Sequence, residues 1–137
     1  MLESENQNIE ETLKHQIQAH NIKKICVSLS GGVDSIVLLY ALNKVLDKDF
    51  SIRAIHINHN LYEGSQSWAD FCQKICDQIQ IQINIYSVKI NNSEGFGIEA
   101  AARNARYHKL QKSIQEGEWL MTAHHQDDQL ETILLRM

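Results

Sequence analysis

The sequence predicts an α/β protein built on a doubly wound parallel sheet with helices on both faces. Segments of strand length alternate along the chain with longer segments of helical periodicity, which is typical of such a sheet. The helix expected over 33–46 is apolar almost all round, which places it beside the centre of the sheet. Polar clusters directly follow three of the expected strands, at the edge where doubly wound sheets bind ligands.

Each element follows from a local pattern. The first helix presents Ile9, Leu13 and Ile17 on one stripe. A later helix carries four large apolar residues at helical spacing, and these are expected in the core: Trp68, Phe71, Ile75 and Ile79. In chain order the expected elements are a helix over 5–19, a strand over 24–29, a helix over 33–46, a strand over 51–57, a helix over 67–78, a strand over 81–88, a helix over 98–115, a strand over 119–122 and a helix over 127–136.

The run Ser30, Gly31, Gly32, Val33, Asp34, Ser35 connects the first expected strand to the apolar helix. Adjacent glycines let the backbone approach an anion, and the free amides and positive dipole end of the following helix bind it. We interpret the run as a loop for nucleotide phosphate, although a simple tight turn is the alternative. The lysine of a Walker A loop is missing, which disfavours transfer of a terminal phosphate.

Asp34 stands inside this phosphate loop. A carboxylate beside phosphates is repulsive unless a divalent cation lies between them. The sequence therefore predicts that Asp34 either holds Mg²⁺ or orders the loop.

The loop resembles that of the PP-loop family, the N-type ATP pyrophosphatases. Three further blocks, in the same order and at fitting spacing, narrow the resemblance to the tRNA(Ile)-lysidine synthetases: 56–61, 97–107 and 122–132. One position departs from their pattern, because Tyr62 stands where many members carry arginine. The resemblance implies the fold of the adenine nucleotide alpha hydrolases.

The resemblance also implies a reaction. ATP, with Mg²⁺, would adenylate the C2 oxygen of the wobble cytidine in a tRNA(Ile) with a CAU anticodon, and free L-lysine would then displace AMP to form lysidine. Asp128 and Glu131, on one face of the expected last helix, would recognise or activate the lysine amine; a solvated acidic face is the alternative. Other possible functions are tRNA thiolation, another PP-loop synthetase or amidotransferase, and a nucleotide-binding module without turnover.

Three groups of side chains are candidates for nucleotide contact. Helical geometry puts Arg103 on the apolar face of its helix and displaces Arg106, so Arg103 is expected to bind phosphate, or else to pair with Glu99 or Asp128. His56 and His59 are three apart and face opposite ways on a strand, so we expect one to pack in the core and the other, with Asn58, to contact the adenine, ribose or phosphates. His124 belongs to the block that faces the loop, where zinc binding is disfavoured because neighbouring histidines diverge.

Composition limits the remaining possibilities. With 137 residues, 43% of them hydrophobic, the chain is long enough for one domain, and its end inside an apolar pattern indicates a catalytic domain cut short. Three cysteines without a Cys-X-X-Cys pair favour reduced thiols, and the absence of a long apolar run or a secretory signal favours the cytoplasm, away from membranes. A net charge of −4 suits tRNA poorly, so the main tRNA-binding surface is expected outside this chain.

Overall fold

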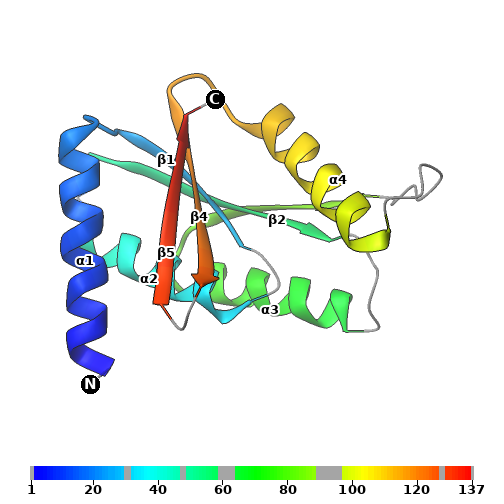
Figure 1. Ribbon diagram of the computed structural model, residues 1–137, viewed down its shortest axis with the longest axis horizontal. Helices are drawn as coiled ribbons and strands as arrows, with labels where there is room; N and C mark the ends of the chain where they lie inside the picture. Colours follow the sequence, from blue (N-terminus) through cyan, green and yellow to red (C-terminus); the bar gives the residue numbers. More distant parts are fainter. Residues whose placement is uncertain are drawn as a thin grey trace.

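The computed structural model of the chain describes residues 2–29, 32–46, 49–58, 64–88, 97–126 and 129–136. Its centre is a five-stranded sheet of order β3-β2-β1-β4-β5 (Figure 1). Strand β1 (Lys24–Ser28) pairs in parallel with β2 (Ser51–Asn58) on one side and with β4 (Glu118–Gln126) on the other. Strand β3 (Gln82–Ser87) continues the parallel pairing beyond β2.

Helices cover both faces of this sheet, as the sequence predicts. Helices α1 (Leu2–Ala19), α2 (Val33–Val45) and α3 (Ser65–Gln78) lie on one face, where their apolar residues join one core cluster with the sheet. Helix α4 (Ile98–Ser113) lies on the other face, where Leu110 packs into a second cluster. The crossover through α4 carries the chain past β1, so the winding reverses between β1 and β4. The doubly wound prediction is therefore confirmed.

The helix predicted over 127–136 is wrong. Residues Gln129–Arg136 form β5, which pairs with β4 in an antiparallel ladder that runs from Gln126 opposite Gln129 to Trp119 opposite Arg136. A short apolar segment can satisfy either period, and here Thr132 and Ile133 are β-branched residues that favour a strand. The ladder extends β4 beyond the predicted 119–122 and gives the parallel sheet one antiparallel edge.

The predicted core position of Phe71 is also wrong. Its side chain is 43% exposed, and its ring lies 5.3 Å from that of the half-buried Trp68. The buried side of α3 is instead made by smaller residues, Ala69, Cys72 and Cys76. The large apolar stripe thus marks one margin of the buried face and not its centre.

A buried ion pair ties both sides of β1 together. Arg53 of β2 donates from Nε and Nη2 to the two carboxylate oxygens of Glu118 on β4, each at 2.7 Å. Its Nη2 also donates to the carbonyl of Ser113 at 2.7 Å, and its Nη1 to Asn84 Oδ1 at 3.4 Å. The side chains of Arg53 and Glu118 are 11% and 4% exposed. This Arg53–Glu118 brace therefore joins β2, β3, β4 and the end of α4.

The cysteines of the chain are packed thiols. Cys26, Cys72 and Cys76 are free and buried, as expected for reduced residues. Burial raises the pKa of both Cys26 and Cys72 to about 12, and that of Cys76 to about 11. These three thiols are therefore poor nucleophiles.

Among the helices of the described ranges, none has the length and apolar character needed to cross a membrane.

Candidate nucleotide-binding site

The point where the winding reverses lies at the carboxyl ends of β1 and β4. Doubly wound sheets bind their ligands at such a reversal of the strand order, so we expect the nucleotide there. The phosphate loop begins there, directly after β1. Ser30 and Gly31 lie outside the described residues, whereas Leu29 before them and Gly32 after them are placed.

Gly32 leads directly into α2, and the protein itself does not require a glycine there. Its φ of −119° and ψ of 160° are open to any residue, and a Cβ added to it would meet no atom of the described residues within 4 Å. Gly32 gives the helix no side-chain cap, while the buried Ser35 hydroxyl donates to the Gly32 carbonyl at 2.9 Å. Because Gly32 has no side chain, the space beside it and the first amides of α2 is left open to an anion.

Val33 and Asp34 form the first turn of α2. Val33 is 69% exposed and Asp34 is half-buried. A carboxylate is favourable at the amino end of a helix, and its oxygens are the ligands that Mg²⁺ prefers. The described ranges contain no cluster of three metal-ligating side chains. A single carboxylate in the first turn of α2 can hold Mg²⁺ together with nucleotide phosphates.

His56 holds the chain where the phosphate loop begins. Its side chain is 5% exposed, and its Nδ1 lies 2.6 Å from the carbonyl oxygen of Leu29. Because a carbonyl only accepts, Nδ1 carries the hydrogen. The Leu29 N–H in turn donates to the carbonyl of Ile55 at 2.8 Å, so both polar groups of Leu29 are bound to β2. Burial lowers the pKa of His56, against the opposing effect of the Leu29 hydrogen bond, and the ring is neutral at pH 7.

The structure shows which environment one of the two histidines, His56 and His59, occupies. His56 is the packed member, and His59 lies outside the described residues. Asn58 is also buried, and its carbonyl accepts from the Val88 N–H at 2.9 Å. Direct contact of His56 or Asn58 with a nucleotide stays a prediction.

Replacing His56 tests whether this hydrogen bond shapes the loop. The variant His56→Leu leaves the buried Leu29 carbonyl without its partner, and we expect ATP affinity to fall about tenfold. The variant His56→Asn keeps an N–H donor at the position of Nδ1, and we expect affinity within about threefold of the parent. Calorimetric titration with ATP measures both. Equal affinities in the two variants would contradict the role of the hydrogen bond.

His124 and Glu131 occupy facing positions in the β4–β5 ladder. His124 lies three residues beyond Met121, the pairing partner of Val27, and therefore toward the carboxyl ends of the parallel strands. Asp128, the other predicted lysine-contacting residue, lies outside the described residues. The predicted helical face shared by Asp128 and Glu131 is wrong, because Glu131 lies on a strand.

The orientation predicted for the two arginines of α4 is wrong as well. Arg103 is exposed, whereas Arg106 is half-buried with its guanidinium carbon 5.6 Å from the centre of the Tyr107 ring. Ala102 and Leu110 make the buried side of the helix. Three consecutive alanines at 100–102 give the sequence little to distinguish one face from the next. Phosphate binding by Arg103 stays a prediction.

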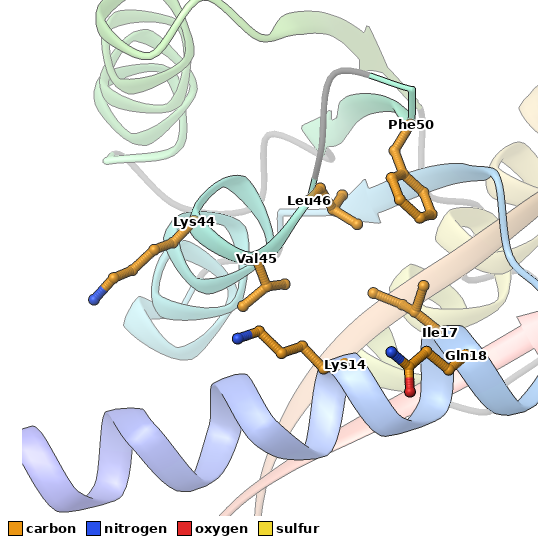
Figure 2. Close-up of a pocket in the computed structure, with 7 residues that line it drawn as sticks. All are labelled: Lys14, Ile17, Gln18, Lys44, Val45, Leu46 and Phe50. Atoms are coloured by element: carbon orange, nitrogen blue, oxygen red, sulfur yellow. The ribbon is translucent and has the colours of Figure 1, made fainter.

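A hollow of about 430 Å³ lies away from this site (Figure 2). Lys14 and Ile17 of α1 line it opposite Val45 and Leu46 at the end of α2. Phe50, which also lines it, directly precedes β2, so the hollow lies at the amino ends of the strands. The nucleotide site is expected at the opposite edge of the sheet.

The PP-loop domain model matches residues 4–137, and the chain belongs to the PP-loop family. Its relatives include proteins named tRNA(Ile)-lysidine synthase. That of Haemophilus influenzae strain Rd is 43% identical over 130 residues, covering 91% of this chain and 30% of the relative. That of Xanthomonas axonopodis pv. citri is 42% identical over 113 residues, covering 82% of this chain and 26% of the relative. The chain therefore spans less than a third of the length of these relatives.

Two solved structures share the fold. The U34-tRNA thiolase NcsA from Methanococcus maripaludis has a TM-score of 0.66 at 22% identity, covering 93% of this chain and 46% of that one. The NH3-dependent NAD synthetase from Campylobacter jejuni has a TM-score of 0.66 at 10% identity, covering 88% of this chain and 55% of the synthetase chain. At such identities the likeness shows the α/β fold alone.

Proposed function

We propose that the chain is the ATP-binding part of an enzyme that joins lysine to the wobble cytidine of a tRNA(Ile) with a CAU anticodon. The observation that carries this proposal is the amino end of α2, which stands at the reversal of the winding with open space beside Gly32. The names of relatives at 42–43% identity support lysine and tRNA(Ile) as the substrates.

In the proposed reaction the C2 oxygen of the cytidine attacks the α-phosphorus of ATP, and pyrophosphate leaves. The ε-amine of lysine then attacks C2, loses a proton and displaces AMP. The loop and the first amides of α2 bind the phosphates and hold them in line for attack. Asp34 would hold Mg²⁺, which neutralises phosphate charge when bound. Arg103 supplies a further cation, and Asp128 and Glu131 attract the lysine ammonium and accept its proton.

Thiolation of tRNA is the competing function on the same fold. Thiolation that proceeds through a protein thiolate needs a reactive cysteine beside the nucleotide. The three cysteines of this chain are buried in the described core with raised pKa values, so none of them suits that step, although residues outside this chain could supply a cysteine.

The decisive experiment incubates the purified full-length protein, of which this chain is the ATP-binding part, with ATP, radiolabelled lysine and a set of tRNAs. Label is expected only in tRNA(Ile) with a CAU anticodon, with one pyrophosphate released per lysine incorporated. ATP binding without any labelled tRNA would indicate a binding module. Sulfur transfer without lysine incorporation would support thiolation instead.

The arginines of α4 differ in exposure, and their removal is expected to differ in effect. The exposed side chain of Arg103 is free to move to phosphate, so Arg103→Ala should lower ATP-dependent pyrophosphate release at least tenfold without lowering the melting temperature. The Arg106 guanidinium rests near the Tyr107 ring, so Arg106→Ala should lower the melting temperature and change turnover less. Pyrophosphate release and thermal unfolding measure the contrast. A larger loss of turnover in Arg106→Ala would contradict the proposed role of Arg103.

A further inference from the structure

Helix α4 is basic in an acidic protein. It contains Arg103, Arg106, Lys109 and Lys112 but only one acidic residue, Glu99, while the whole chain has a net charge of −4. Helix α1, in contrast, contains four glutamates and one lysine. Positive charge is therefore concentrated on the one described helix that covers the second face of the sheet (Figure 1).

The outer side of α4 is uniformly polar. Its exposed side chains from the second turn onward are Arg103, Asn104, His108, Gln111 and Lys112. None of them is acidic, and none of the large exposed hydrophobic residues of the described chain lies on this helix. The half-buried Lys109 adds its charge at the margin, where its Nζ lies 4.4 Å from the centre of the Tyr86 ring on β3. We call the five exposed residues the α4 stripe.

The α4 stripe starts near the nucleotide site and leads away from it. Helix α4 follows the carboxyl end of β3 and ends shortly before the amino end of β4, so it runs back across the sheet. Arg103 stands in its first half, toward the edge that carries the phosphate loop, and Lys112 stands in its last turn. Nine residues separate them, a rise of about 13 Å along the helix.

We propose that the α4 stripe binds the phosphate backbone of the RNA substrate on its way into the active site. The proposal rests on the proposed function, which makes an RNA the substrate. Lysine and arginine bind phosphates by releasing counterions, and amide side chains such as Asn104 and Gln111 donate to phosphate or ribose oxygens. An acidic protein partner is disfavoured, because protein interfaces rely on apolar or aromatic anchors that the stripe lacks.

A reversal of charge at Lys112 tests the proposal. The variant Lys112→Glu should weaken binding of unmodified tRNA about fivefold or more at low salt, and it should reduce the slope of log affinity against log salt by about one. Lys74→Glu is the matched control: this exposed lysine near the end of α3 lies on the opposite face of the sheet, and its variant should bind like the parent. Lys112→Arg should also bind like the parent. Fluorescence anisotropy measures all four proteins.

Equal tRNA affinity and salt slope in Lys112→Glu and Lys74→Glu would overturn the proposal, as would a parent protein that binds no tRNA at low salt. An unchanged salt slope in Lys112→Glu would point to a protein partner and would also overturn it.

The proposed reaction is judged separately, by lysine incorporation at saturating tRNA. Incorporation there should be unchanged in the control variant Lys74→Glu. If the parent incorporates no lysine, the proposed function fails while the binding measurements still decide the role of the stripe.

Discussion

Replacing Asp34 with asparagine is expected to lower ATP-dependent turnover by about a hundredfold, the usual scale for a lost electrostatic contact in an active site. The substitution keeps the size of the side chain in the first turn of α2 but removes its charge. The fold should therefore survive, and thermal unfolding provides that check. Asp70→Asn is the control, because Asp70 is an exposed carboxylate on α3 that accepts only from Gln66 among the contacts described. Its turnover should match that of the parent.

A magnesium titration separates the two roles left open for Asp34. If the carboxylate holds Mg²⁺, the variant needs more metal for half-maximal turnover. If it orders the loop, the metal requirement is unchanged and ATP binds more weakly without metal. Unchanged turnover in Asp34→Asn would exclude both roles.

Truncating Arg53 is expected to cost about 3 kcal/mol of unfolding free energy or more, because it leaves the buried Glu118 carboxylate without its partner. Replacing both residues, as in Arg53→Met with Glu118→Leu, should cost less than the sum of the single changes, since no buried charge is then stranded. Urea unfolding of the parent, the two single variants and the double variant measures this coupling. Strictly additive losses would contradict it.

The same brace makes stability depend on pH. Burial alone would raise the pKa of Glu118, but the hydrogen bonds from Arg53 and from the Gln115 N–H lower it below the usual 4.5. The unfolded chain thus binds this proton more readily than the folded chain. The contribution of Glu118 is complete above pH 4.5 and is lost as the pH falls through the lowered value.

Elements whose sequence has one clear period were predictable. The strands and helices from α1 to α4 lie where the apolar spacing puts them, and Gly32 directly precedes α2 as expected. The strand at 129–136 was not predictable, because its apolar spacing fits both a helix and a strand, and only its pairing with β4 decides between them. The exposure of Arg103 and Phe71 depends on which side of a helix meets the sheet, and small residues at that contact leave little signal.

The local sequence does not identify the partners in the hydrogen bond from His56 to Leu29 or in the Arg53–Glu118 brace. Their partners are 27 and 65 residues apart, and nothing in the neighbourhood of either residue specifies the other. A buried charge or histidine within an apolar strand is the one hint the sequence offers, since such a group needs a partner. The identity of that partner follows only from the register of the strands.

The brace also bears on how long the folded state lasts. Arg53 and Glu118 can meet only after β1 has taken its place between β2 and β4, which requires contacts of long sequence separation. Because such contacts close large loops, we expect this ion pair to form late in folding. An interaction absent from the transition state leaves the folding rate unchanged and slows unfolding. We therefore expect this one ion pair to lengthen the lifetime of the folded protein by slowing unfolding, and to change the rate of folding little.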